Sequence, residues 1–439
     1  MTSPPAPPSA DDQAGFQEAL LSHAAGDFLK AVEFYQSMPE HAADYLEGQH
    51  YLGIALHHLG RHEQAITVLE KTVSQSDARI DWLGNFANVL VAQNKLTDAI
   101  RIFEKMHRLA PEDVQTLINL GSVYERSQHS ETAEQCYQKA IALDPNCQEA
   151  YRLLSTLYAQ QGRAAESVEA YCRSYILSPI EDTTPFLLGK AYYVLGQLEK
   201  AAEVYQRWKE QDPGNPIPVH LHAACSNQNV PDRCSDAYIH VTFDDYAPEF
   251  DQKLSQLGYS GPSLLDQLLK DLAPPTQALT ILDAGCGTGL CAPMLKPYAR
   301  TLTGVDLSSA MLAYADQRAL YDELYCQEIG AYLDAAPHPY DLIVCMDTLI
   351  YFGALDPIIG QITRALTPQG LLIFTTEMLT EEIYPFKLQA SGRYAHHRSY
   401  LDVCFNRHGL KSIHCSEQIL RTELDKPVRG YLIAASRSA

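Results

Sequence analysis

The apolar residues of this chain follow two different patterns, one before and one after about residue 240. Over residues 12–215 they recur at helical spacing, and the whole pattern repeats every 34 residues. At this interval stand the residues that would form the turn between two helices: Gly26, Gly60, Asn94, Gln128, Gly162 and Gly196. The pattern therefore predicts six helical pairs that stack into an all-α solenoid.

Two further positions keep the same interval. Five residues after each turn comes a small residue, where two helices can cross closely: Ala31, Ala65, Ala99, Ala133, Ser167 and Ala201. Four residues further on comes a large residue that we expect to fill the space between neighbouring pairs: Tyr35, Leu69, Phe103, Tyr137, Tyr171 and Tyr205. This unit resembles the tetratricopeptide repeat, and the resemblance implies a superhelix whose concave face binds a peptide or protein. The alternative is that the repeats only dimerise the chain or shield its other domain.

From about residue 279, short apolar runs each end in a polar residue, which is typical of the strands of a doubly wound α/β sheet. Three glycines at alternate positions, Gly285, Gly287 and Gly289, follow the first run. Glycines let the backbone approach a ligand without interference from Cβ, and the start of a following helix offers free N–H groups. The second run ends in Asp306, which could accept hydrogen bonds from the two hydroxyls of a ribose.

Together with the runs that end at Asp347 and Glu377, these motifs resemble the class I S-adenosylmethionine-dependent methyltransferases, whose glycine motif has the form Asp-x-Gly-x-Gly-x-Gly. The resemblance covers residues 279–439. It implies a Rossmann-like α/β domain over residues 242–439, with a mostly parallel seven-stranded sheet, an antiparallel final strand and S-adenosylmethionine as cofactor. The whole arrangement looks like that of the predicted tetratricopeptide-repeat methyltransferases.

The same resemblance implies which residues contact the cofactor. Asp283 would order the ammonium group and Asp306 would bind the ribose, while the glycines admit the methionine portion. Glu328 would take the adenine amino group and Ile329 would contact the ring; the alternative for Glu328 is an exposed surface carboxylate. The complete set of predicted cofactor contacts is Asp283, Gly285, Gly287, Gly289, Asp306, Leu307, Glu328, Ile329 and Met346.

The sequence indicates the residues that would contact the methyl acceptor less specifically than those that would contact the cofactor. Asp347 and Tyr351 follow the fourth run, at the edge of the sheet where ligands bind. An insertion over residues 379–400 holds arginines that could pair with an acceptor carboxylate and a histidine that could accept a proton. The catalytic candidates are His396, Asp347 and Tyr351, and the predicted substrate contacts are Arg393, Tyr394, Tyr246 and Phe250. The alternatives are a solvated loop for the insertion and core packing for Tyr246 and Phe250.

The composition of the chain limits the classes of binding partner that we expect. The net charge is −21, with 33 basic and 54 acidic residues, so we expect no nucleic-acid substrate, because phosphate binding relies on Lys and Arg. The Asn/Asp-Pro-Pro-Tyr signature of base methylation is also absent. No apolar run approaches membrane-spanning length, which predicts no membrane partner. The 11 cysteines have no regular spacing, which favours a reducing cytoplasm.

The remaining segments carry no recognisable chemistry. Residues 1–11 lack the features of a signal peptide and are predicted to be a disordered tail. Residues 216–241 break the repeat and are predicted to form a cap and linker. Their histidines and cysteines lack the short pairs typical of zinc sites, so we predict no metal.

The sequence thus predicts S-adenosylmethionine-dependent methyl transfer to an acceptor, which we expect to be a peptide or protein recruited by the repeats. One alternative is a small metabolite or natural product as acceptor, with the repeats serving oligomerisation or partner docking. A second alternative is a non-enzymatic scaffold that only binds the cofactor. The acceptor atom and the oligomeric state stay open.

Overall fold

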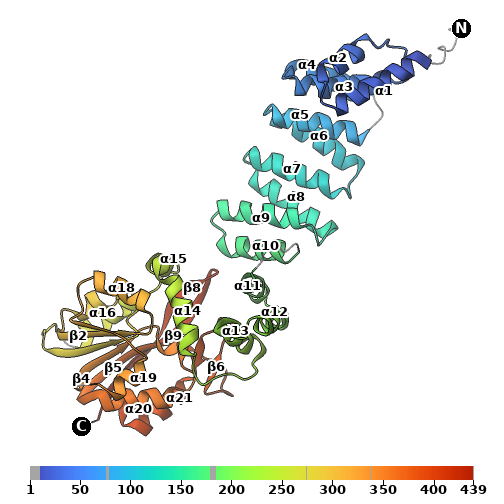
Figure 1. Cartoon of the computed structure of the whole chain (residues 1–439). Helices are drawn as coiled ribbons and strands as arrows, with labels where there is room; N and C mark the ends of the chain where they lie inside the picture. The colour runs from blue at the N-terminus through green and yellow to red at the C-terminus, as the bar shows by residue number, and fades with distance from the viewer. Residues whose placement is uncertain (1–9, 76–78, 178–183, 273, 337, 439) are drawn as a thin grey trace. The chain divides into compact units, whose positions relative to one another are not determined.

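The computed structural model describes residues 10–75, 79–177, 184–272, 274–336 and 338–438 (Figure 1). The chain divides into two compact units, Met1–Ser178 and Pro179–Ala439. The predicted tail, residues 1–11, lies outside the described residues except for its last two, which begin the first helix. No helix in the described ranges combines the length and the apolarity needed to cross a membrane.

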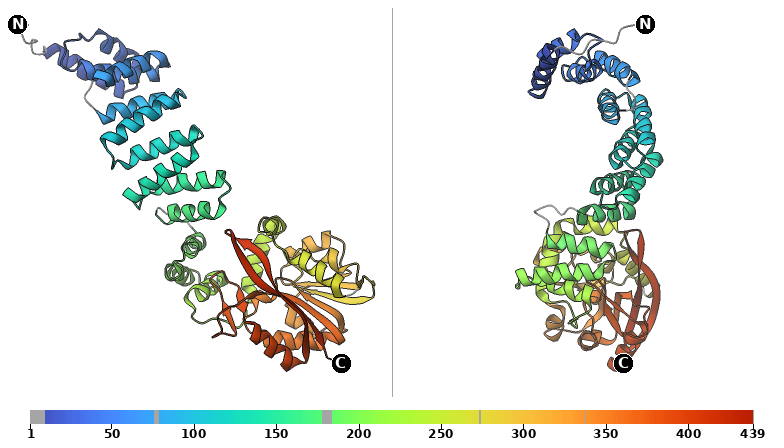
Figure 2. Two further views of the ribbon diagram at one scale, coloured as in Figure 1. Left: turned by 180° about the vertical axis from the view of Figure 1, so that it is seen from behind. Right: turned by 90° about the vertical axis from the view of Figure 1, so that its right-hand side faces the viewer.

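The first unit is the predicted array of helical pairs. Its described helices are α1 (Ala10–Ala24), α2 (Phe28–Ser37), α3 (Tyr45–His58), α4 (His62–Gln75), α5 (Ile80–Ala92), α6 (Leu96–Leu109), α7 (Val114–Arg126), α8 (Ser130–Leu143), α9 (Gln148–Gln160) and α10 (Ala164–Leu177). Successive pairs follow one another along a curved path, as the right-hand view of Figure 2 shows. Each helix is too short to be stable alone, so the unit depends on packing between pairs.

The 34-residue sequence pattern is matched by a repeating backbone conformation. All six predicted turn residues, from Gly26 to Gly196, have positive φ angles between 57° and 81°. Asn94 and Gln128 adopt this left-handed conformation without being glycine. The predicted small residues Ala31, Ala65, Ala99, Ala133 and Ala201 are completely buried. The helix-pair prediction is therefore confirmed at the level of single residues.

The large residues of the repeat are buried with one exception. Tyr35, Leu69, Phe103, Tyr137 and Tyr205 are at most 3% exposed, as predicted. Tyr171 is 56% exposed, so the prediction that it fills a space between pairs is wrong. It lies on α10, the last helix of the first unit, where no later pair of that unit covers it.

The second unit begins with the sixth helical pair, α11 (Pro185–Val194) and α12 (Leu198–Gln211), followed by α13 (Pro216–Ser226). The sixth pair therefore belongs to the same compact unit as the sheet, although its sequence continues the repeat pattern, which ends at residue 215. A helical segment leads on to the sheet through α14 (Asp236–Tyr246), the short 3-10 helix η1 (Ala247–Glu249), α15 (Phe250–Gln256) and α16 (Gly261–Leu272).

A single mixed sheet forms the centre of the second unit. Its strands are β1 (Leu279–Ala284), β2 (Ala299–Asp306), β3 (Glu323–Cys326), β4 (Tyr340–Cys345), β5 (Leu366–Met378), β6 (Phe386–Leu388), β7 (Tyr394–His396), β8 (Leu410–Glu423) and β9 (Lys426–Arg437). The order β3-β2-β1-β4-β5 is parallel throughout. As predicted, the final strand is antiparallel: β9 lies between β5 and β8 and runs opposite to both. The described sheet has nine strands rather than the predicted seven, because the insertion after β5 adds β6 and β7.

Helices cover both faces of the sheet. On one face α16 and α17 (Ala292–Leu295) bury a cluster that includes Leu265, Leu295 and Ile281. On the other face α19 (Ile329–Asp334), α20 (Leu355–Ala365) and α21 (Arg398–His408) bury a second cluster. Burial on both faces fixes the parallel strands, and their carboxyl ends meet at one edge.

The helical pairs depend on glycines where a large ring lies against the partner helix. A Cβ added at Gly121 of α7 would lie 2.5 Å from Cε1 of Tyr137, a ring that Ser122 and Glu125 hold in place. We predict that Gly121→Ala lowers the free energy of unfolding by about 1–3 kcal/mol, because the ring must move. The measurement is urea unfolding of the full chain, followed by helical circular dichroism.

Gly84→Ala in α5 is the matched control. Its added Cβ would meet only the terminal methyl carbon of Met106, at 3.4 Å. Helix propensity should then dominate and stabilise the chain by about 0.5–1 kcal/mol. Equal shifts of the two unfolding midpoints would contradict the packing argument.

Candidate functional site

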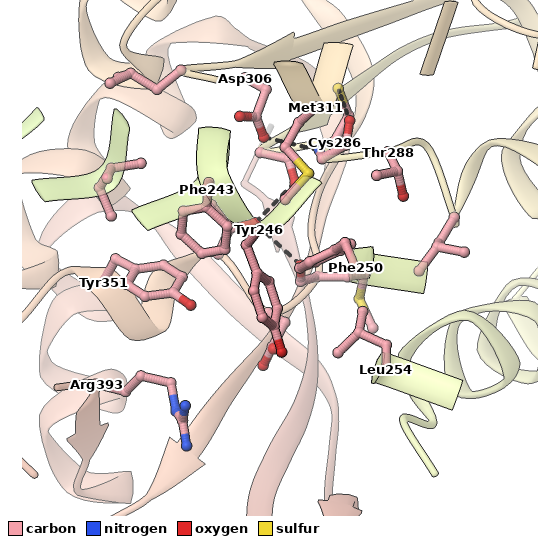
Figure 3. Close-up of a pocket in the computed structure, with 18 of the residues that line it drawn as sticks. Phe243, Tyr246, Phe250, Leu254, Cys286, Thr288, Asp306, Met311, Tyr351 and Arg393 are labelled. Atoms are coloured by element: carbon pink, nitrogen blue, oxygen red, sulfur yellow. Dashed lines mark hydrogen bonds between the residues drawn. The ribbon is translucent and has the colours of Figure 1, made fainter. Parts of the chain in front are cut away.

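A cavity of about 230 Å³ lies at the carboxyl edge of the parallel strands (Figure 3). Its walls come from the turn after β1, the loop after β2, the residues after β4 and the helices α14 and α15. Of the predicted site residues, the following line it: Asp283, Gly285, Gly287, Asp306, Leu307, Glu328, Ile329, Met346, Asp347, Tyr351, Arg393, Tyr246 and Phe250. The structure therefore brings together residues that lie up to 147 positions apart, from Tyr246 to Arg393.

The glycine turn has the backbone that its sequence predicts. Gly285 and Gly287 have φ angles of 78° and 54°, which L side chains rarely adopt. A Cβ at Gly285 would also collide with the side chain of Thr348. Gly289 shares the left-handed conformation but does not line the cavity; its space is taken by Tyr321 and Arg318. The third glycine thus permits packing, whereas the first two border the cavity.

Asp306 ties the turn after β1 to the loop after β2. Its Oδ2 accepts a hydrogen bond of 2.9 Å from the backbone N–H of Gly287, and its Oδ1 accepts one of 2.9 Å from Ser308. Burial raises the pKa of this carboxyl, and the two backbone donors oppose that rise. Each carboxylate oxygen still has a lone pair that can accept a hydroxyl from the cavity side.

Asp283, at the end of β1, is only 2% exposed. The hydroxyl of Tyr321 donates a hydrogen bond of 2.6 Å to its Oδ2. Burial raises the pKa of this carboxyl to about 7, while the Tyr321 bond lowers it and the charge of Asp306 raises it further. Tyr321 was not predicted from the sequence, because it lies 38 residues from its partner.

The far end of the cavity, next to β3, has a carboxylate and apolar side chains. Glu328 is half-buried and caps α19 by accepting a 2.8 Å hydrogen bond from Ala331 N–H. Ile329, Leu307 and Met346 also line the cavity. A half-buried carboxylate beside apolar groups suits a flat, amino-bearing ring.

The segment α14–α15 forms a side of the cavity with Phe243, Tyr246 and Phe250 (Figure 3). Two aspartates fasten it to the loops of the sheet. Asp244 accepts a 2.5 Å hydrogen bond from the Ser308 hydroxyl, and Asp251 accepts one of 2.5 Å from the Thr288 hydroxyl. Tyr246 and Phe250 are therefore cavity residues, and the segment is bonded to the same loops that carry Gly287 and Asp306.

On the side of β5 and β8, five charged residues form what we call the ion cluster: Asp347, Glu377, Arg393, Arg421 and Glu423. Arg421 is only 2% exposed and contacts all three carboxylates. The sequence analysis assigned no site role to Arg421, Glu377 or Glu423, because only the pairing of β9 with both β5 and β8 brings them together.

Besides Gly289, two predicted residues lie outside the cavity, His396 and Tyr394, so their proposed roles are corrected. His396 is completely buried: its Nδ1 bonds the Thr376 hydroxyl at 2.5 Å, and its Nε2 donates to the carbonyl of Phe352 at 2.8 Å. Burial lowers the pKa of His396 to about 4, and both nitrogens are already engaged. Tyr394 is likewise buried and donates to the carbonyl of Pro231 at 2.6 Å. Both residues hold the β6–β7 hairpin in place instead of meeting a substrate.

The segment predicted as cap and linker braces the same hairpin. Nε2 of the buried His220 in α13 donates a 2.8 Å hydrogen bond to the carbonyl of Gly392, directly before Arg393. The backbone N–H of Cys234 bonds the carbonyl of Tyr351 at 2.8 Å. Within the described ranges, no group of three His, Cys, Asp or Glu side chains could hold a metal ion.

Comparisons with known proteins found matches to the repeats and to the sheet domain. A family profile described as a methyltransferase domain matches residues 281–370. Profiles described as tetratricopeptide repeats match residues 46–71, 118–181 and 186–216. The chain is 31% identical to human methyltransferase-like protein 27 over 175 residues, which are 38% of this chain and 67% of that protein.

Two further matches are more distant or shorter. The malonyl-[acyl-carrier protein] O-methyltransferase of Priestia megaterium is 33% identical over 120 residues, which are 26% of this chain and 43% of that protein. A solved structure of the Synechocystis PCC 6803 magnesium protoporphyrin IX methyltransferase with bound SAH aligns with a TM-score of 0.35 at 19% identity, over 46% of this chain and 100% of that chain. The chain thus spans two thirds of the human relative and less than half of the bacterial one.

The raised pKa of Asp283 predicts a pH-dependent stability. The protonated carboxyl contributes stability below its ordinary pKa of 3.8, and this contribution is lost as the pH rises to about 7. Asp283→Asn keeps an acceptor for Tyr321 but cannot ionise. We predict that its free energy of unfolding, relative to the wild type, rises by about 2–3 kcal/mol between pH 5 and pH 8, at about 1.4 kcal/mol per pH unit over the titrating range.

Urea unfolding at both pH values measures this difference. Asp316→Asn, on the exposed side of α18 (Ser309–Gln317), serves as the control and should show no such change. A stability difference for Asp283→Asn that is independent of pH would contradict the buried-carboxyl argument.

Proposed function

The chain belongs to the class I S-adenosylmethionine-dependent methyltransferases, and we propose that it transfers a methyl group to a peptide or protein that its helical repeats recruit. The observation that carries the proposal is the junction of the glycine turn with Asp306. A left-handed turn without Cβ atoms, beside a carboxylate with spare lone pairs, has the features that bind a nucleoside through its ribose.

The residues of the cavity fit S-adenosylmethionine. This cofactor, when bound, supplies a methyl group on a positively charged sulfur that is already a good leaving group. Asp283, Asp306 and Glu328 all line the cavity, and we assign them to the ammonium, the ribose and the adenine of the cofactor respectively. The chain's own task is to position the acceptor and exclude water, which the aromatic wall of Phe243, Tyr246 and Phe250 supports.

The helical array supports a macromolecular acceptor. Stacked repeats expose an extended face by construction, and such faces bind peptide segments. A small metabolite would require no such surface, so under that alternative the repeats would serve oligomerisation or docking. A scaffold without activity is disfavoured, because degenerate domains usually lose the glycines or the ribose carboxylate, and this chain retains both at the cavity.

We predict that Asp306→Ala weakens S-adenosylmethionine binding by about 1.5–3 kcal/mol, roughly 10- to 150-fold, because two hydrogen bonds to a charged group are lost. Isothermal titration calorimetry on the full chain measures the change. The variant also loses the two backbone contacts of Asp306, so its thermal unfolding is measured in parallel.

Asp316→Ala, which removes an exposed aspartate of the following helix, should bind like the wild type. No binding of either S-adenosylmethionine or S-adenosylhomocysteine by a folded wild type would overturn the proposed function. Equal affinities of wild type and Asp306→Ala would refute the assigned ribose site while leaving the family assignment intact.

The nature of the acceptor can be tested separately. The full chain is incubated with methyl-labelled S-adenosylmethionine and a cell extract that ultrafiltration has split into macromolecular and small-molecule fractions. We predict that the label enters the macromolecular fraction and that Asp306→Ala lowers the incorporation in proportion to its loss of affinity. Label confined to the small-molecule fraction would favour the metabolite alternative.

A further inference from the structure

Four members of the ion cluster, Asp347, Arg393, Arg421 and Glu423, line the cavity on the side of the residues after β4, and Glu377 lies behind them, bonded to both arginines. All three kinds of nitrogen in Arg421 are engaged: Nε with Glu423 at 2.7 Å, Nη1 with Asp347 at 3.1 Å, and Nη2 with Glu377. Arg393 donates from Nε to Glu377 at 2.8 Å and from Nη2 to Glu423 at 2.6 Å. Neither arginine therefore offers a free fork for binding an anion.

The charges of this wall do not balance. Three carboxyl groups face two guanidinium groups, so the cluster has one more acidic than basic side chain. The imbalance extends around the cavity, whose lining includes six acidic side chains and three arginines. An acceptor carboxylate would therefore enter a region that already has excess negative charge, and the low dielectric of a buried site strengthens that repulsion.

Asp347 is the member of the cluster with unused capacity. Its two oxygens share a single donor, Nη1 of Arg421, at 3.1 and 3.4 Å. Its backbone adopts a φ of 55°, an uncommon conformation for a residue other than glycine, and its N–H is anchored to the Thr375 hydroxyl at 2.8 Å. A residue with such a constrained backbone, directly after the carboxyl end of a strand, indicates a functional carboxylate.

Aromatic rings face the same space. Phe243 meets Tyr351 edge to face, with ring centroids 5.4 Å apart, and Phe250 lies 6.2 Å from Phe243. The hydroxyl of Tyr351 has no hydrogen-bond partner among the described residues and points into the cavity (Figure 3). Carboxylates combined with aromatic faces are the usual environment for an ammonium group.

We propose that the methyl acceptor is an amine, which enters the cavity as an ammonium group held by Asp347 against the rings of Phe243 and Tyr351. This inference rests on the proposed function and names its substrate class: the side-chain or terminal amine of a peptide. Arg421 positions Asp347, while Glu423, whose charge disfavours an acceptor anion, and its partner Arg393 complete the wall.

The chemistry balances without another reactant. The ammonium first gives one proton to Asp347, which releases it to water. The lone pair of the neutral amine then forms the nitrogen–carbon bond while the carbon–sulfur bond breaks and its electron pair stays on sulfur. The products are a methylated ammonium group and S-adenosylhomocysteine. Asp347 is thus the catalytic residue in this proposal, because it touches the reacting nitrogen.

An experiment must separate amine binding by Asp347 and the two rings from two alternatives. Asp347 and the rings could serve the positive sulfur of the cofactor instead of the acceptor. Alternatively, the acceptor atom could be an oxygen, which is what the bacterial relative's name states for that protein. The test must therefore distinguish a charge on the acceptor side from a charge on the cofactor.

The probes are three analogues of S-adenosylhomocysteine in which a nitrogen replaces the sulfur and carries a propyl, an aminopropyl or a carboxyethyl arm. The arms have similar lengths and project toward the acceptor, so that their dissociation constants report on its charge. Calorimetry measures them, with S-adenosylmethionine and S-adenosylhomocysteine, on the full-length wild type, on Asp347→Asn and on Glu417→Gln. Glu417 is exposed on β8 and provides a matched loss of one carboxylate away from the cavity.

We expect the aminopropyl analogue to bind the wild type about 10-fold or more tightly than the propyl analogue, and the carboxyethyl analogue to bind more weakly than both. In Asp347→Asn the ion cluster becomes neutral, and asparagine tolerates the left-handed backbone. The advantage of the amine should then fall to about 3-fold or less, with the affinity for S-adenosylhomocysteine unchanged. Glu417→Gln should retain the wild-type order.

A carboxyethyl analogue that binds most tightly, or an aminopropyl analogue no better than propyl, would overturn the amine assignment. So would an Asp347→Asn variant that loses affinity for S-adenosylmethionine relative to S-adenosylhomocysteine while keeping the amine preference, since Asp347 would then serve the cofactor. Failure of the three analogues alone refutes the acceptor site, whereas failure of S-adenosylmethionine and S-adenosylhomocysteine as well refutes the proposed function itself.

Discussion

Two backbone N–H groups converge on the carboxylate of Asp306, and the geometry of the cavity depends on this contact. It joins the turn after β1, through Gly287, to the loop after β2, through Ser308. The same two loops receive Asp251 and Asp244 from the helical segment α14–α15. The parallel register of β1 with β2 brings these loops to one edge, and the buried apolar clusters on both faces of the sheet hold that register. A change at Asp306 would therefore affect the cavity wall as well as the proposed ribose contact.

The cavity buries more negative than positive charge, and this has an energetic cost that the fold offsets only in part. Arg421 and Arg393 offset part of the charge of the three carboxyl groups of the ion cluster, but Asp283 has only a neutral hydroxyl from Tyr321 and a raised pKa. Removing one partner of a buried ion pair leaves the charge of the other partner uncompensated. A cationic ligand removes that cost. The sulfonium and ammonium groups of the cofactor, and an ammonium on the acceptor, each suit a cavity of this charge.

How much the sequence could predict depended on how local each feature is. The 34-residue interval identified all six left-handed turn positions, and the glycine turn and Asp306 were found because each lies within or directly after a strand. Tyr321 and Arg421 were missed, because Asp283 and Asp347, the site residues that they contact, lie 38 and 74 residues away and meet them only through strand pairing and loop packing. His396 was misassigned for a related reason: residue type and position in the insertion say nothing about which face of the β6–β7 hairpin a side chain occupies, and this ring packs inward.

The helix that follows the sixth pair, α13, braces the hairpin that carries Arg393, a residue of the cavity wall. His220 of α13 fixes the carbonyl of Gly392, and the next residue is Arg393 of the ion cluster. Leu221 of the same helix packs with Ala201 and Tyr205 of α12, so one short helix contacts both the last repeat and the hairpin that carries Arg393. A displacement of the sixth pair would shift Arg393 and, through Glu377 and Glu423, the environment of Asp347. An enzyme for a free metabolite has no need for such a connection, whereas an enzyme that receives its acceptor from the repeats would require the last repeat and the acceptor site to be held in a fixed relation.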